Sequence, residues 1–120
     1  MKMPISEIID RYTITKLKSE RTNEDVQEEL DLYKKELSQY NESLDKYINL
    51  MYDINGKIWD TEGDIRKGVD LPLDQIGRLA LKVRDLNCER NGIKADIVDE
   101  FSEGFKEIKI NYRKINYGRD

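Results

Sequence analysis

The chain of 120 residues contains no histidine, which removes the most common general base and a common zinc ligand of proteins. It has a single cysteine, Cys88, so no disulfide can form within the chain. It has two prolines, and no apolar run approaches the ~20 residues that a membrane-spanning helix needs. These absences lead us to expect a soluble, cytoplasmic protein that uses neither a metal nor a cofactor.

What the sequence does have is charge and a regular spacing of apolar residues. Charged residues make up 38% of the chain and hydrophobic residues another 38%, with a mean hydropathy of −0.80. The regular spacing favours an elongated helical bundle over a disordered chain. We expect one domain from the length, and we expect it to self-associate because a thin bundle buries little surface per residue.

The longest apolar pattern runs from Val26 to Ile65 in alternating steps of four and three residues. Its members are Val26, Leu30, Tyr33, Leu37, Tyr40, Leu44, Tyr47, Met51, Ile54, Ile58, Thr61 and Ile65. The steps never slip and no proline interrupts them, so the pattern predicts one long helix over residues 24–67. The tyrosines of this pattern form a stripe suited to an interface, and we expect a homodimer with this helix near its two-fold axis.

Two further helices are predicted, over residues 6–21 and 73–103. The apolar face of the first consists of Ile5, Ile8, Ile9, Tyr12 and Leu17, and that of the last includes Ile76, Leu79, Val83, Leu86, Ile93, Ile97 and Phe101. Short connections make consecutive helices antiparallel. We therefore expect an all-α fold, an elongated three-helix antiparallel bundle with coiled-coil-like heptad packing, over residues 1–103.

The last part of the chain, residues 104–120, changes period. Ile108, Ile110 and Tyr112 alternate with polar residues, which is typical of a strand. This segment carries a net charge of +3, whereas residues 23–68 carry −6. We predict a short, basic, extended arm that docks on the acidic body or on a sister subunit. A frayed terminus and a nucleic-acid-binding arm remain alternatives, but the acidic body argues against nucleic-acid binding by the bundle itself.

A first polar cluster lies on the long predicted helix. Trp59, Glu62 and Arg66 share one stripe with Asn55, beside the apolar seam. Glu62 and Arg66 are four residues apart and can form an ion pair on a helix. One interpretation is the wall of a ligand site, made of an aromatic ring, a carboxylate and a guanidinium. The other is an exposed ion pair beside a core tryptophan.

A second cluster surrounds Arg90, which falls on the apolar seam of the last predicted helix. Asn87 lies one turn before it and Lys94 one turn after it. A buried arginine must be paired, because an unpaired buried charge is very costly, and folding the chain into antiparallel helices brings Asp53 to roughly its level. A network that fixes helix register and an anion-binding or catalytic pocket are the two interpretations.

Three segments resemble an uncharacterised family of small, all-helical proteins from bacteria and tailed phages. Residues 8–21 resemble its opening segment, residues 58–66 its W-D-x-E-x-x-I-R segment and residues 85–94 its N-x-x-R-x-x-x-K segment. The resemblance implies a helical fold, and the host cytoplasm as location if the origin is a phage, but it carries no activity. It places these residues in the family's motifs: Asp10, Lys18, Arg21, Trp59, Glu62, Arg66, Asn87, Arg90 and Lys94.

The sequence thus leads us to expect a non-enzymatic, self-associating helical module that binds a protein partner and no membrane. The long heptad pattern, the missing histidine and the absence of a catalytic motif all favour this function. The alternative is a small-molecule-binding protein or a cofactor-independent enzyme. That alternative would use Trp59, Glu62, Arg66, Asn87 and Arg90.

Overall fold

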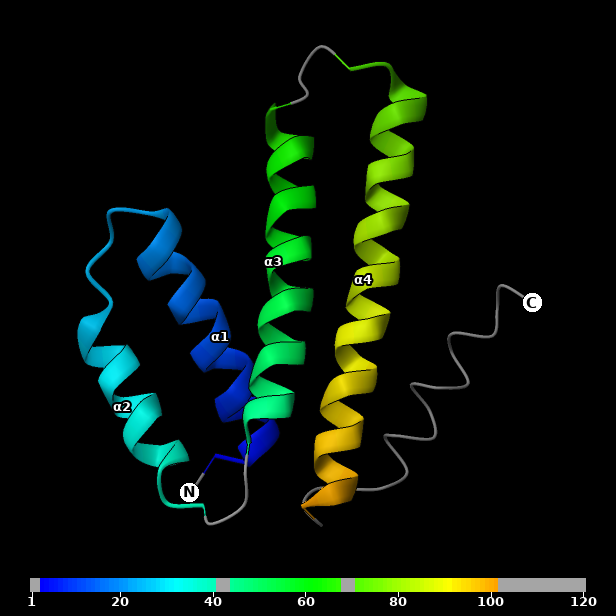
Figure 1. Cartoon of the computed structure of the whole chain (residues 1–120). Helices are drawn as coiled ribbons and strands as arrows, with labels where there is room; N and C mark the ends of the chain where they lie inside the picture. The colour runs from blue at the N-terminus through cyan, green and yellow to red at the C-terminus, as the bar shows by residue number, and fades with distance from the viewer. Residues whose placement is uncertain (1–2, 41–43, 68–70, 102–120) are drawn as a thin grey trace.

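The computed structural model describes residues 3–40, 44–67 and 71–101, and over these residues the secondary structure is helical, with no strand. It contains α1 (Ile5–Arg21), α2 (Gln27–Leu37), α3 (Asp45–Lys67) and α4 (Leu73–Glu100). The helices form two hairpins, α1–α2 and α3–α4 (Figure 1). The all-α prediction is confirmed, but the described residues form four helices where the sequence predicted three.

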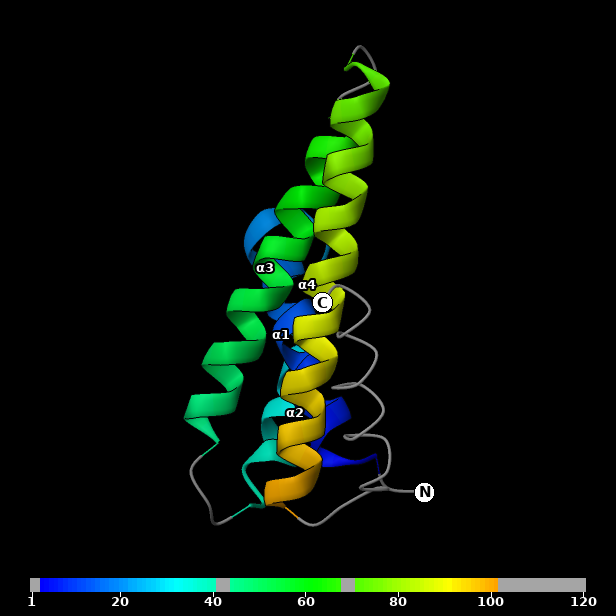
Figure 2. The same ribbon diagram turned by 90° about the vertical axis from the view of Figure 1, so that its right-hand side faces the viewer.

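Helix α1 is the central layer of the fold. It packs against α2 on one side and against α3 and α4 on the other (Figure 1). The α3–α4 hairpin continues past the end of the α1–α2 hairpin, as both views show (Figures 1 and 2). We call this protruding part, residues 59–67 of α3 and 73–83 of α4, the distal half of the hairpin.

The single helix predicted over residues 24–67 is wrong, because α2 ends at Leu37 and α3 begins at Asp45. The amides of Gln39 and Tyr40 donate to carbonyls three residues back, each at 3.3 Å, which closes the end of α2 as a tight turn. Leu37 and Leu44 are seven residues apart, which is one full heptad. The apolar positions after the break therefore continue the heptad spacing of those before it.

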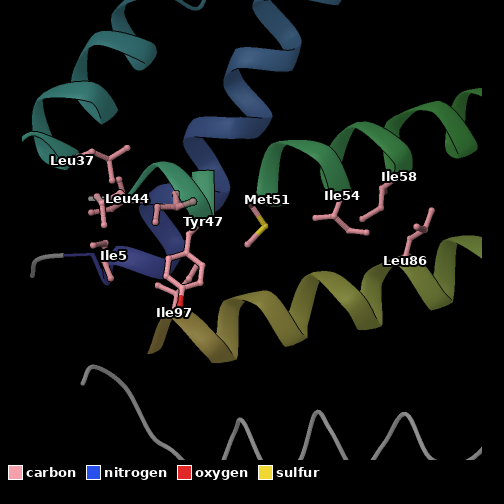
Figure 3. Close-up of a cluster of buried hydrophobic side chains, with 11 residues drawn as sticks. Ile5, Leu37, Leu44, Tyr47, Met51, Ile54, Ile58, Leu86 and Ile97 are labelled. Atoms are coloured by element: carbon pink, nitrogen blue, oxygen red, sulfur yellow. The ribbon is translucent and has the colours of Figure 1, made fainter. Parts of the chain in front are cut away.

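Nine of the twelve positions of the heptad pattern are buried despite this break, and the other three are half-buried. The core consists of Ile5, Ile8, Ile9, Leu37, Leu44, Tyr47, Met51, Ile54, Ile58, Leu86 and Ile97. Figure 3 shows Ile5, Leu37 and Leu44 gathered at one end of this cluster, with Ile54, Ile58 and Leu86 between α3 and α4 at the other. The pattern therefore predicted which side chains are buried, although it did not predict the path of the chain.

The tyrosines of the stripe pack against the core of their own chain, and the homodimer expected around them stays a prediction. Tyr47 is buried, its hydroxyl donates to Glu100 Oε1 at 2.9 Å, and its ring meets the edge of Phe101 with the ring centroids 6.1 Å apart. Tyr33 and Tyr40 pack against the same core and are half-buried. Of the three tyrosines, Tyr47 is therefore enclosed by its own chain, whereas Tyr33 and Tyr40 keep part of their surface exposed.

The remaining boundaries agree closely with the sequence. Helix α1 begins one residue before the predicted 6–21, after Pro4 as its N-cap, and α4 ends three residues before the predicted 103. The basic arm predicted over residues 104–120 lies outside the described residues. None of the described helices has the length and apolarity that crossing a membrane requires.

Candidate functional site

The centre of the candidate site is an ion pair between Asp10 on α1 and Arg90 on α4. Arg90 donates through Nε to Asp10 Oδ1 at 3.0 Å and through Nη2 to Oδ2 at 2.5 Å, which is a bidentate contact. The Asp10 side chain is 2% exposed and that of Arg90 is 26% exposed. The predicted partner of Arg90 was Asp53, which is wrong, because Asp53 is exposed and pairs with Lys57 at 3.2 Å.

Other polar side chains complete a network around this ion pair. Asn55 on α3 donates through Nδ2 to Asp10 Oδ1 and to Thr13 Oγ1, each at 3.0 Å. The Thr13 hydroxyl donates to the Asp10 carbonyl at 2.8 Å. Lys94 Nζ lies 3.7 Å from Asp10 Oδ2 and 2.9 Å from Glu7 Oε2. The network therefore fastens α1 to both α3 and α4.

Neighbouring groups determine the protonation states of Asp10 and Arg90 in the network. Burial raises the pKa of the Asp10 carboxyl, but hydrogen bonds from Arg90 and Asn55, with the charges of Arg90 and Lys94, outweigh it and hold the pKa below its ordinary value. The hydrogen bond to Asp10 raises the pKa of Arg90 above its already high ordinary value. Both groups therefore stay charged at neutral pH, and Asp10 is a weak candidate for a general base.

A hollow of about 200 Å³ lies beside the network, lined by residues of α1, α3 and α4. It is lined by Ile14, Leu17, Asn55, Ile58, Trp59, Glu62, Asn87 and Arg90. The structure thus brings together four of the predicted site residues. The polar groups at its wall are partly engaged, since Arg90 Nη1 donates to Asn87 Oδ1 at 3.4 Å and Asn87 Nδ2 donates to the Val83 carbonyl at 3.1 Å.

A second, larger hollow of about 490 Å³ adjoins the first and shares Trp59 with it. It is lined by Arg21, Trp59, Asp60, Gly63, Asp64, Arg66 and Lys67. Arg21 Nη1 lies 2.6 Å from Asp60 Oδ1, which joins the end of α1 to α3. The predicted ion pair of Glu62 with Arg66 is absent from the described residues, because these side chains face the two different hollows.

Eight of the nine predicted site residues belong to the network or to one of the two hollows. Asp10, Arg90 and Lys94 form the buried network, with Asn87 at its edge. Trp59 and Glu62 belong to the smaller hollow and Arg21, Arg66 and Trp59 to the larger one, whereas Lys18 lines neither.

Sequence reasoning missed Glu7 and Thr13 as members of the network. Both lie three residues from Asp10, so the helical spacing around Asp10 could have identified them.

This arrangement can hold helices in register and presents two polar–aromatic hollows. Among residues 3–40, 44–67 and 71–101, no group of three or more cysteine, aspartate or glutamate side chains is placed to hold a metal ion. No protein-family model, curated protein or solved structure matches the chain. The resemblance to a helical family of bacteria and phages therefore stays a prediction from three sequence segments.

Proposed function

We propose that this chain is a non-enzymatic, self-associating helical module that binds a protein partner. The observation that carries the proposal is the bare distal half of the α3–α4 hairpin. Where α1 packs on the hairpin, Met51 and Ile97 are fully buried. In the distal half Ile76, Leu79 and Val83 are only half-buried, and Leu73 and Leu81 are 86% and 51% exposed. Exposed apolar surface of this kind is typical of protein-interaction sites, and this part of the hairpin carries two exposed leucines beside three half-buried apolar side chains.

The polar network supports the same proposal. The polar atoms of the network bond to one another. Hydrogen bonds among Asp10, Asn55 and Arg90 hold three helices together. A catalytic or anion-binding arginine needs donors that are free to meet a substrate. Hydrogen bonds of this kind between three helices are what a structural role in helix register requires.

Sedimentation velocity of the full chain over a range of concentrations tests self-association. We expect the weight-average mass to rise from monomer toward dimer as concentration increases. Leu73→Ser should weaken the dimer because it removes an exposed apolar side chain of the distal half. Leu32→Ser is the matched control, since Leu32 is 56% exposed but lies on α2, away from the distal half. A chain that stays monomeric at every concentration contradicts the proposal.

Small-molecule binding in the smaller hollow is a second candidate function. Trp59 at its wall favours this candidate, but its volume of about 200 Å³ lies below the ~300 Å³ at which most ligand pockets begin. A thermal-shift screen with nucleotides, sugar phosphates and acidic metabolites tests it, since a ligand at a hundredfold excess over Kd adds ~2.7 kcal/mol of apparent stability. A shift abolished by Asn87→Ala but kept by Asn91→Ala would support it, because Asn91 does not line the hollow.

A further inference from the structure

One face of α3 is left uncovered beyond the end of α1. Helix α1 ends at Arg21, which meets Asp60 through the 2.6 Å ion pair, and α3 continues from there to Lys67. Apart from Arg21, every residue that lines the larger hollow belongs to α3. The hollow is therefore an open helix face, about two turns long, that carries Trp59, Asp60, Gly63, Asp64, Arg66 and Lys67.

Gly63 lies at the middle of this face, and its own chain gives no packing reason for a glycine. A Cβ atom added at Gly63 would meet nothing within 4 Å. Glycine inside a helix costs ~1 kcal/mol relative to alanine, so the position forgoes helix stability without a contact that needs the space. The missing side chain makes Gly63 the point of this face that another backbone can approach most closely.

Apart from Asp64, the charges around Gly63 are arranged so that the face complements a reversed copy of itself. Asp60 lies three residues before Gly63 and Lys67 four residues after it, while Trp59 and Arg66 stand four before and three after. An antiparallel α3 crossing at Gly63 brings Asp60 level with Lys67 of the second copy, within the ~1.5 Å rise of one residue. It brings Trp59 level with Arg66 in the same way, which suits a cation–π contact.

We propose that this face of α3 binds the same face of a second copy of the chain, antiparallel and centred on Gly63. The two-fold axis repeats the Asp60–Lys67 ion pair and the Trp59–Arg66 contact, so each favourable contact counts twice. The inference rests on the proposed self-association and assigns the surface that performs it. Helix α1 limits the contact, because its last residue, Arg21, already occupies the level of Asp60.

Glutamine substitutions at two glycines test the surface. Gly63→Gln should raise the melting temperature of the monomer, because glutamine favours helix, and should weaken the dimer at least about tenfold, because it places two side chains at the closest point. Gly92→Gln is the matched control: an added Cβ there also meets nothing within 4 Å, but Gly92 lies on α4 outside the distal half of the hairpin. It should raise the melting temperature and leave the dimer dissociation constant unchanged by sedimentation.

Charge reversal tests the pairing itself. Lys67→Glu should weaken the dimer by placing glutamate opposite Asp60 twice, and Asp60→Lys with Lys67→Glu should restore it. A wild-type dimer that Gly63→Gln leaves intact overturns this surface while self-association stands. A wild-type chain that is monomeric at all concentrations overturns both this inference and the proposed self-association.

Discussion

Replacing Arg90 by methionine removes the cation that faces the buried Asp10 carboxylate while keeping much of the side-chain volume. Asp10 loses its bidentate partner at 3.0 and 2.5 Å and keeps the Asn55 hydrogen bond at 3.0 Å and the more distant Lys94 at 3.7 Å. Removing one partner of a buried ion pair costs about 3–5 kcal/mol. Because the Arg90 side chain is 26% exposed, we expect the lower end, ~3 kcal/mol of lost unfolding free energy.

The loss should depend on pH in a direction that the surroundings of Asp10 determine. In the wild type the pKa of Asp10 is lowered, so its contribution is present above the ordinary value of 3.8 and is lost as pH falls through the lowered pKa. In Arg90→Met, burial still raises the pKa of the Asp10 carboxyl, and only Asn55 and Lys94 remain to lower it. We expect this pKa to rise above its ordinary value. Protonation of Asp10 then removes the cost of its unpaired carboxylate as pH falls. The difference in unfolding free energy between the wild type and Arg90→Met therefore narrows between about pH 7 and pH 4.

Urea denaturation of both proteins, followed by circular dichroism at the two pH values, measures this gap. Arg78→Met is the control, because Arg78 is 75% exposed and its ion pair with Asp74 spans 3.3 Å at the surface. It should change the unfolding free energy by less than ~0.5 kcal/mol. Equal effects of the two substitutions, or a gap for Arg90→Met that does not change with pH, would refute the structural role of the network.

Three further outcomes are expected. Met51→Ala should cost ~2–5 kcal/mol, because Met51 is fully buried, while its neighbour Leu50, 44% exposed, should tolerate alanine within ~1 kcal/mol in the same urea titrations. Burial, with help from Glu100, raises the pKa of Tyr47 from 10.0 to about 12, so wild-type stability should fall as pH rises between these values. Tyr47→Phe should show a smaller fall when denaturation midpoints are compared across this range. Arg21→Gln should change the melting temperature little, because its ion pair with Asp60 is exposed.

The sequence predicted burial well and the path of the chain less well, for a reason visible at residues 37–44. Leu37 and Leu44 are one heptad apart, so a pattern search cannot distinguish a continuous helix from a helix, a turn and a second helix in phase. The signal that was overlooked is local. Residues 38–43 read Ser-Gln-Tyr-Asn-Glu-Ser, in which serine and asparagine favour turns by bonding to the nearby backbone.

The candidate site shows a different limit. Arg90 was correctly expected to be paired, because its position on an apolar seam demands a partner whatever the fold. The identity of the partner depends on which helix lies across that seam, and Asp10 on α1 lies 80 residues away in the chain. Comparing positions along antiparallel helices related only α3 to α4, and this comparison pointed to Asp53 as the partner. The position of α1 therefore had to come from the structure.

Helix α1 lies between α2 on one side and α3 and α4 on the other. This position determines the order in which the helices can detach during partial unfolding. Helix α2 packs chiefly on α1, and α1 on α3 and α4, so α2 can detach while the other helices stay in place. Detachment of α1 must carry α2 with it and must break the Asp10 network. We therefore expect amide hydrogens of α2 to exchange through partial openings of low free energy, and those of Asp10 and its neighbours only at larger openings. The α1–α2 hairpin would then behave as a separate cooperative unit that the apolar face of α1 and one buried carboxylate keep attached to the rest of the protein.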